Sequence, residues 1–116
     1  MHEYSIVQSL VDSVAAAVGS RDAVVRRIEV LIGDVSGVDT TLLATAFEVF
    51  REGTICEGAV LTIDRVPRRW ECSRCGGEVV PGGFLRCPDC NAPARLAAGD
   101  EIVLQRIELE VADVPA

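Results

Sequence analysis

Residues 23–32 read Ala-Val-Val-Arg-Arg-Ile-Glu-Val-Leu-Ile, and apolar and charged positions alternate along the second half of this stretch. One face of an extended chain would carry Ile28, Val30 and Ile32, and the other would carry Arg27 and Glu29. A period of two residues is typical of a β-strand with one buried face. We therefore expect residues 23–32 to form a strand that packs against helices on its apolar side.

Two segments around this strand show the spacing of helices. Residues 4–18 place apolar side chains three and four positions apart: Ile6, Val7, Leu10, Val11, Val14 and Val18. The same spacing recurs after Asp39, at Leu42, Leu43, Ala46, Phe47 and Phe50. Each pattern predicts an amphipathic helix with one buried face. Asp39 has the chemistry of an N-cap, since its carboxylate can accept a hydrogen bond from a free main-chain amide of the second helix.

Two more strands are predicted further along the chain, at residues 58–66 and 101–111. Their expected buried positions are Ala59, Leu61 and Ile63 in the first, and Val103, Ile107, Leu109 and Val111 in the second. The order of elements predicts an α+β fold, with a small three-stranded mixed sheet and two helices on one face. With 116 residues, 49% of them apolar, the chain can form one modest core. We expect that domain to comprise residues 1–66 and 99–116.

Residues 67–98 carry two Cys-x-x-Cys pairs and form the expected insertion between the second and third strands. The pairs are Cys72 with Cys75 and Cys87 with Cys90. Two such turns can build a closed tetrahedral site of four thiolates, most often for zinc, with iron as the alternative. A closed site leaves no position for substrate, so we expect a structural zinc in a zinc-ribbon-like module. Thiol–disulfide exchange competes as an interpretation, but that chemistry uses one pair at a strand–helix turn.

Composition excludes several classes of function. The formal net charge of -7 disfavours a nucleic-acid partner, because phosphate binding depends on a basic field. No apolar run approaches the length of a membrane span, and the chain does not begin with a basic leader. Paired cysteines in such a chain favour metal binding over disulfides. We therefore also expect a cytoplasmic location. The isolated Cys56 is expected to be a buried apolar residue.

The stretch Met1-His2-Glu3 contains the single histidine of the chain. The α-amine of Met1, the main-chain nitrogen of His2 and its Nδ1 can close two chelate rings around one cation. Three nitrogens in a plane suit Ni(II) or Cu(II), with a carboxylate or water at the fourth corner. The alternatives are plain: His2 can be a solvated terminal residue, and Glu3 can simply oppose the positive end of the helix macrodipole.

Taken together, several stretches resemble the HypA/HybF family of nickel metallochaperones for [NiFe]-hydrogenase maturation. They are Met1-His2-Glu3-Tyr4-Ser5, the segment from Asp39 to Phe50, Gly58-Ala59, the two cysteine pairs, Gly99-Asp100-Glu101-Ile102 and Ile107-Glu108-Leu109-Glu110. The resemblance runs through the whole chain in the same order. It implies a nickel-binding domain with a zinc domain inserted near its C-terminal end.

The resemblance also implies particular ligands and partners. Nickel would be a transferable cargo held by Met1, His2 and Glu3, with Asp39 beside them as a further ligand or support. Zinc would be held by Cys72, Cys75, Cys87 and Cys90. The expected partners are a maturation GTPase of the HypB type and the hydrogenase large subunit, without nucleic acid or membrane, for a protein that is a monomer or a weak homodimer.

Two rival functions remain at this point. The first is a zinc-ribbon adaptor that binds protein or nucleic acid without carrying nickel. Four arginines near the first cysteine pair favour it, namely Arg65, Arg68, Arg69 and Arg74, and the overall acidity disfavours it. The second is an enzyme, which is weaker still, because the chain has one histidine, no Ser/His/Asp set and no phosphate loop. We therefore expect no catalytic residues.

Overall fold

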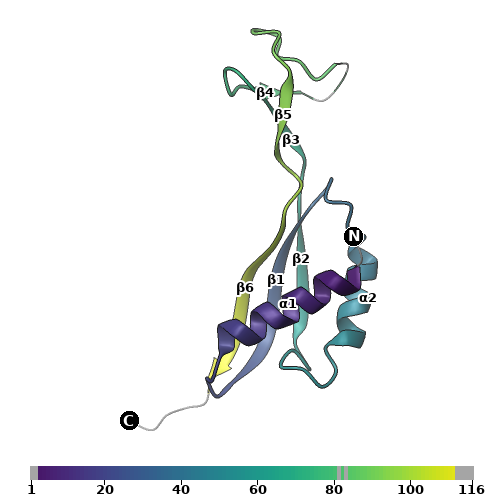
Figure 1. Cartoon of the computed structure of the whole chain (residues 1–116), viewed down its shortest axis with the longest axis vertical. Coiled ribbons are helices and arrows are strands. Elements are labelled where there is room, and N and C mark those ends of the chain that lie inside the picture. Colours follow the sequence, from purple (N-terminus) through teal and green to yellow (C-terminus); the bar gives the residue numbers. More distant parts are fainter. Residues whose placement is uncertain (1–2, 81, 83, 112–116) are drawn as a thin grey trace.

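The computed structural model describes residues 3–80, 82 and 84–111, and the chain is elongated, with extents of 62 × 35 × 17 Å. Two helices and a sheet form the wide part, and a second, smaller sheet stands at the far end (Figure 1). In chain order the elements are α1 (Glu3–Val18), β1 (Ala23–Gly33), α2 (Thr40–Phe50), β2 (Val60–Val66), β3 (Arg69–Cys72), β4 (Glu78–Val79), β5 (Ala94–Ala98) and β6 (Ile102–Val111).

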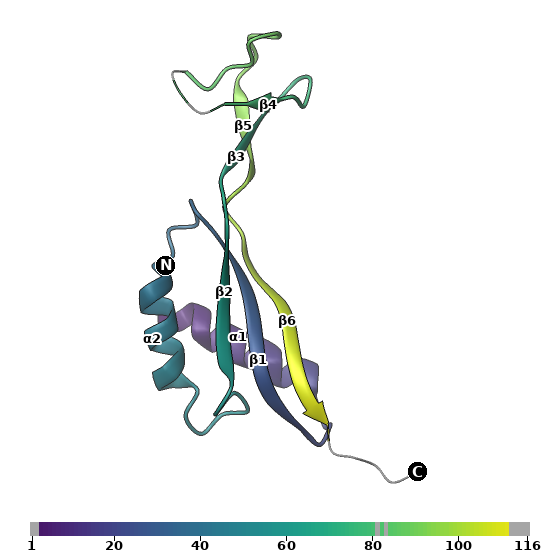
Figure 2. The same ribbon diagram turned by 180° about the vertical axis from the view of Figure 1, so that it is seen from behind.

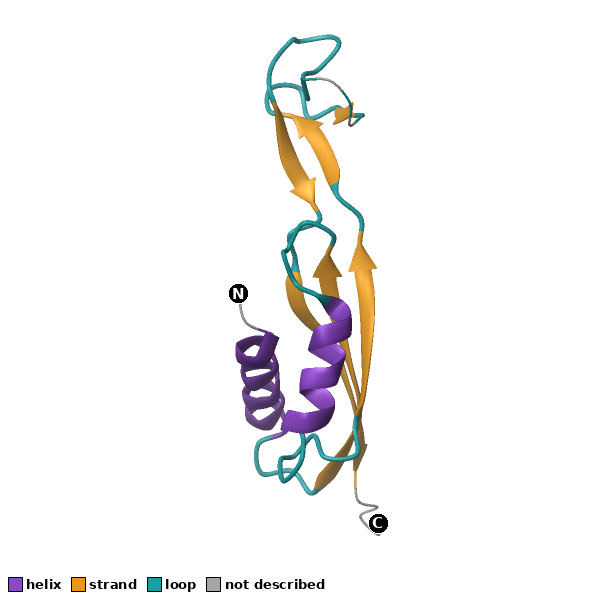
Figure 3. Ribbon diagram, turned by 90° about the vertical axis from the view of Figure 1, so that its right-hand side faces the viewer, coloured by secondary structure: helices purple, strands orange, loops and turns teal. Residues whose placement is uncertain are grey.

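The wide part is built on a mixed sheet of order β2-β1-β6. The strand β1 lies in the centre, parallel to β2 and antiparallel to β6. Both helices lie on the same side of this sheet, as the side view shows (Figure 3). The predicted α+β fold, with three strands and two helices on one face, is confirmed.

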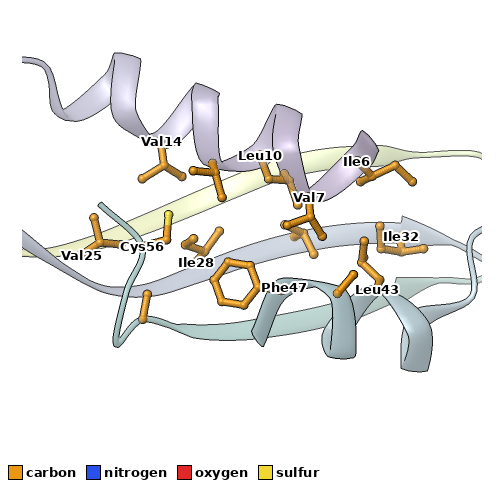
Figure 4. Close-up of a cluster of buried hydrophobic side chains, with 14 of the residues drawn as sticks. Ile6, Val7, Leu10, Val14, Val25, Ile28, Ile32, Leu43, Phe47 and Cys56 are labelled. Carbon is orange, nitrogen blue, oxygen red and sulfur yellow. The ribbon is translucent and has the colours of Figure 1, made fainter. Parts of the chain in front are cut away.

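The core fills the space between the helices and β1 (Figure 4). The apolar face predicted for α1 is buried along its whole length, and Leu43 and Phe47 of α2 meet it from the side. Ile28, Val30 and Ile32 of β1 are fully buried, whereas Arg27 lies on the open face of the sheet. The alternation in residues 23–32 therefore identified the buried face of the central strand correctly.

The prediction for the last strand was wrong at two of its four buried positions. Ile107 and Leu109 pack against the core, but Val103 and Val111 are 44% and 59% exposed. The reason for the error at Val103 is a bulge in β6: Glu29 pairs with Arg106 and the next residue of β1 pairs with Leu104, so Gln105 is extra. A bulge reverses the side to which the preceding residues point. The residues that join the core before it are Ile102 and Leu104.

The strands β3, β4 and β5 form a second sheet of order β4-β3-β5, which was not predicted from the sequence. The rear view shows β2 continuing into β3 and β5 returning into β6 (Figure 2). The small core of this sheet consists of Cys72, Val79, Cys87 and Ala92, with Trp70 packed against it. Half of this core is therefore cysteine.

The two sheets are joined at a narrow crossing, where Gly33 at the end of β1 meets Gly99 between β5 and β6. The absence of side chains on these glycines makes the close approach possible. A Cβ on Gly33 would lie 2.0 Å from the carbonyl oxygen of Gly99, so neither backbone could keep its place. Gly99 has φ +116 and passes close to Arg68. The amide of Val35 donates to Gly99 O at 2.7 Å, and the amide of Asp34 donates to Val66 O at 2.9 Å. The loop after β1 is thus hydrogen-bonded to both strands that lead to the second sheet.

None of the described helices is long and apolar enough to cross a membrane.

Candidate metal centres

The four paired cysteines come together at the far end of the second sheet. Cys72 ends β3, and the other three lie in the turns that follow. Their sulfur atoms all lie within 4.8 Å of one another, and the Sγ atoms of Cys75 and Cys87 are 3.8 Å apart. A tetrahedron of thiolates around zinc, with bonds of about 2.3 Å, has edges of about 3.8 Å. The arrangement therefore fits a zinc-ribbon-like site.

Both cysteine pairs use the same turn. The amide of Gly76 donates to Cys72 O at 3.0 Å, and the amide of Asn91 donates to Cys87 O at 2.8 Å. Gly76 and Asn91 have φ of 76 and 57, in the left-handed region that glycine and asparagine tolerate best. Each turn therefore has a residue that tolerates this conformation directly after its second cysteine. These turns aim each pair of sulfurs at one point.

Main-chain amides also point at the sulfurs. The amides of Arg74 and Cys75 donate to Cys72 Sγ at 3.3 and 3.4 Å, and the amide of Cys90 donates to Cys87 Sγ at 3.4 Å. Amide donors stabilise a thiolate, and the amides of Cys75 and Arg74 lower the pKa of Cys72 to about 6. These donors belong to the turns and could not be identified from side-chain types alone.

The fourth cysteine shows the opposite effect. The sulfur of Cys75, together with burial and the sulfur of Cys87, raises the pKa of Cys90 to about 12. Four thiolates in one place repel one another unless a cation lies between them, so the sulfurs cannot all ionise on their own. A divalent ion removes this conflict, because its charge and four bonds satisfy every sulfur at once.

A second arrangement of polar groups lies where the two helices begin. The start of α1 stands beside the start of α2, although 36 residues separate Glu3 from Asp39 (Figure 1). The amide of Asp39 donates to Glu3 Oε2 at 3.2 Å. Both residues were predicted as candidate nickel ligands, but this hydrogen bond between them was not predicted. Met1 and His2, the other proposed nickel ligands, lie outside the described residues.

Asp39 is the N-cap of α2, as predicted. Its Oδ1 accepts from the amide of Leu42 at 3.0 Å, and its extended backbone, with φ −80 and ψ 108, is that of an N-cap residue. The Asp39 side chain is therefore engaged by its own helix, whereas Glu3 belongs to the first turn of α1. The Glu3 carboxylate, one residue after the histidine in the sequence, is thus hydrogen-bonded to the main chain at the start of α2.

Cys56 and the arginines that were singled out in the sequence have contacts within the fold. Cys56 is fully buried in the main core, and burial raises the pKa of its thiol, as expected for an apolar cysteine. Arg65 forms an ion pair with Asp34 at 3.2 Å, and Arg95 pairs with Glu71 at 2.8 Å. Exposed pairs of this kind contribute little to stability. Of the four arginines near the first cysteine pair, Arg65 is thus paired with a carboxylate.

The fold and the cysteine site together define a small α+β metal-binding protein. A family model described as "Hydrogenase/urease nickel incorporation, metallochaperone, hypA" matches residues 1–109. The chain is 39% identical to a hydrogenase maturation factor HypA of Wolinella succinogenes and 41% identical to one of Geobacter metallireducens. These matches cover 97% and 95% of this chain, and 98% and 100% of the relatives. The chain therefore belongs to the HypA family of nickel-incorporation metallochaperones.

Solved structures agree with this assignment. The solution structure of a HypA protein superposes with a TM-score of 0.73 at 31% identity, covering 95% of this chain and 97% of that one. The solution structure of the Ni metallochaperone HypA from Helicobacter pylori gives a TM-score of 0.68 at 30% identity, covering 97% and 100%. The expected resemblance to this family is confirmed for the whole length of the fold.

Proposed function

We propose that the protein binds Ni(II) at the start of its chain and delivers it during [NiFe]-hydrogenase maturation. The ligands are the α-amine of Met1, the main-chain nitrogen and Nδ1 of His2, and a carboxylate at the fourth corner. One observation carries the proposal: Glu3 and Asp39 are held together at the beginning of α1. In a chain of the HypA family, a fixed carboxylate that directly follows the single histidine in the sequence supports a nickel site there.

Glu3 is the better candidate for the fourth corner. It is adjacent to His2 in the chain, and the amide of Asp39 donates to only one of its oxygens. Asp39 Oδ1 already caps α2. Asp39 thus serves as a positioning residue, because its amide donates to Glu3 of α1 while its side chain caps α2. Its negative charge also favours a nearby cation.

The nitrogen ligands make the cargo transferable. A free α-amine and a free imidazole titrate at about 7.7–8.0 and about 6.5, so metal binding to such nitrogens at neutral pH releases protons. The planar arrangement of nitrogen ligands favours Ni(II). The ion is released by ligand exchange when the protein docks on an acceptor. Cu(II) binds such a site more strongly, so selectivity comes from metal availability and partner contact.

The second metal has a structural role in this proposal. Cys72, Cys75, Cys87 and Cys90 hold Zn(II), and residues 67–98 fold around it as a unit separate from residues 1–66 and 99–116. Four thiolates fill the tetrahedral positions, so the ion has no place for substrate. The protein accordingly acts as a carrier without catalytic residues and not as an enzyme.

The proposed partners follow from the carrier role. A GTPase of the HypB type and the hydrogenase large subunit are protein partners, and the net charge of -7 gives no reason to add nucleic acid or a membrane surface. The four ligand thiols need a reducing compartment, which places the protein in the cytoplasm. Nothing in this role requires more than a monomer or a weak homodimer.

Nickel titration of the tag-free, zinc-loaded protein tests the proposal. The unmodified chain should bind one Ni(II) with the visible spectrum of a planar site. Acetylation of the amine, or the substitution His2→Ala, should abolish that spectrum, and Gln8→Ala on the exposed side of α1 is the matched control. Unchanged nickel binding after both modifications would refute the carrier and favour the zinc-ribbon adaptor.

A further inference from the structure

A groove of about 340 Å3 lies between α1 and β6. Its walls and floor are three serines and two apolar residues of α1 with two apolar residues of β6: Ser5, Ser9, Ser13, Ile6, Leu10, Ile102 and Leu104. None of these seven side chains can ionise. The groove therefore suits an uncharged, apolar group, and the small serines leave room for it on the helix side.

The strand that borders this groove is at the edge of its sheet, and its pairing with β1 shows which main-chain groups face outward. The amide of Gly33 donates to Glu101 O at 2.7 Å. Hydrogen-bonded and non-bonded pairs alternate along an antiparallel ladder. The pair that follows Gly33 and Glu101 is Ile32 with Ile102, and it is therefore non-bonded. The same holds two residues further along, where Val30 pairs with Leu104. Ile102 and Leu104 direct their N–H and C=O groups away from β1.

Because β6 is the last strand in the order β2-β1-β6, these groups face no strand among the described residues. The side chains of the same two residues line the groove. Unpaired edge groups are a template for an added strand, with alternate side chains of the guest entering a pocket. Backbone pairing and an apolar pocket thus coincide at Ile102 and Leu104.

We propose that this groove binds an extended segment of a partner protein. The segment pairs with the main chain of Ile102 and Leu104 and buries an apolar side chain between β6 and α1, over Ile6 and Leu10. Asp100 and Glu101 immediately precede Ile102, and Asp100 is exposed. The segment is therefore apolar at alternate positions and flanked by Lys or Arg.

The groove lies close to the proposed nickel site, so a segment bound in it would bring its protein near the nickel ion. Ser5 lies two residues after Glu3, in the first turns of the same helix. A partner held there has part of its surface next to the nickel end of the chain. This last step rests on the proposed function, whereas the strand pairing does not depend on nickel.

The experiment uses the full, zinc-loaded chain and the synthetic peptide acetyl-Lys-Val-Thr-Val-Thr-Val-Lys-amide. Amide exchange followed by NMR should show slower exchange at Ile102 and Leu104 when the peptide binds. Ser9→Trp places a large ring in the groove and should weaken binding at least about tenfold, which corresponds to about 1.4 kcal/mol. Gln8→Trp, at the neighbouring exposed position outside the groove, is the matched control and should leave the affinity unchanged.

Several results would overturn the inference. They are absence of peptide binding, binding without protection of the Ile102 and Leu104 amides, or equal weakening by Gln8→Trp. Sedimentation showing a dimer that Ser9→Trp dissociates would instead assign the groove to a second copy of this chain. Acetylation of the α-amine separates the two proposals, since it should abolish nickel binding and leave peptide binding intact. Loss of peptide binding on acetylation would count against a groove that acts on its own.

Discussion

The two sheets of this protein differ in what holds them together. Among the described residues, fifteen buried apolar side chains form the core of the β2-β1-β6 sheet, whereas the β4-β3-β5 sheet has four, two of which are cysteines. The first can be stabilised by apolar burial, at about 25 cal/mol per Å2. The second has too little apolar surface to order its long turns. In the proposed function, a metal ion takes the place of a core there.

This difference also separates their roles. A hydrophobic core slows the exchange of main-chain amide protons. The two helices whose starts hold Glu3 and Asp39 pack against the larger core, so these residues belong to the more stable region. The four cysteines cluster next to the β4-β3-β5 sheet, which stands at the opposite end of the molecule (Figure 2). The two regions are joined at the crossing, where Gly33 approaches Gly99. The following predictions test how far each region depends on its own means of stabilisation.

The largest expected effect is the loss of the metal. A structural zinc contributes roughly 10 kcal/mol or more, so chelation or Cys87→Ser should unfold residues 67–98. The main-chain amides of β1 should remain protected from exchange, because the pairing and the core of this strand do not involve the four clustered cysteines. Residue-resolved amide exchange measures both regions in one experiment. Simultaneous loss of protection in β1 and β3 would show a single cooperative unit.

Cys56 provides an internal control for that experiment. It is buried in the main core, and burial raises the pKa of its thiol, so it stays protonated and inaccessible at neutral pH. After chelation, iodoacetamide should modify the other four cysteines and spare Cys56, as read by mass spectrometry. Early modification of Cys56 would mean that the main core opens when the metal leaves.

The second largest effect should come from the main core. Phe47 is 1% exposed, and Phe47→Ala should lower the free energy of unfolding of this sheet by about 3–5 kcal/mol. Val49→Ala on the exposed side of α2 is the matched control and should change it by less than about 0.5 kcal/mol. Urea unfolding followed by circular dichroism gives both values. Loss of the metal in Phe47→Ala before unfolding would contradict the separation of the regions.

A smaller effect is expected at the crossing. Gly33→Ala would place a Cβ 2.0 Å from Gly99 O, and overpacking of this kind costs about 1–3 kcal/mol. The substitution should also disturb the hydrogen bond from the Val35 amide to Gly99 O. Exchange at Val35, with the fluorescence of Trp70 as the reporter for β3, measures the change. Wild-type stability in Gly33→Ala would show that the crossing can widen freely.

The smallest effect concerns the cap of α2. Asp39→Ala removes the acceptor for the Leu42 amide and should cost about 1 kcal/mol, whereas Asp39→Asn can keep the cap. If Glu3 is the nickel ligand, Asp39→Asn should bind nickel nearly as the wild type does, and Glu3→Gln should bind it more weakly. Thermal unfolding and nickel titration separate the two roles. The reverse order of nickel affinities would assign the fourth corner to Asp39.

Local patterns predicted much of this architecture because burial is periodic. The spacing in α1, the alternation in β1 and the cap at Asp39 each depend on residues close together in the chain. The two cysteine pairs were equally readable, since a Cys-x-x-Cys turn brings two sulfurs to one ion with few degrees of freedom. These parts of the prediction needed no knowledge of distant contacts.

Other features could not be predicted in this way. The bulge at Gln105 depends on how β6 pairs with β1, so alternation within β6 put Val103 on the wrong face. The strands of the second sheet are short and have few apolar positions to announce them.

By itself, the sequence determined the types of the main elements, the four sulfurs that cluster and the family to which the chain belongs, because these reside in periodicity, spacing and order. The contacts between Glu3 and Asp39 and between Gly33 and Gly99 depend on the packed fold, and so does the groove that the side chains of Ile102 and Leu104 line at the edge of the sheet. Each of these joins residues far apart in the chain, or depends on which strand ends at the edge of the sheet. Only the packing of helices and strands on one another brings such groups within bonding distance.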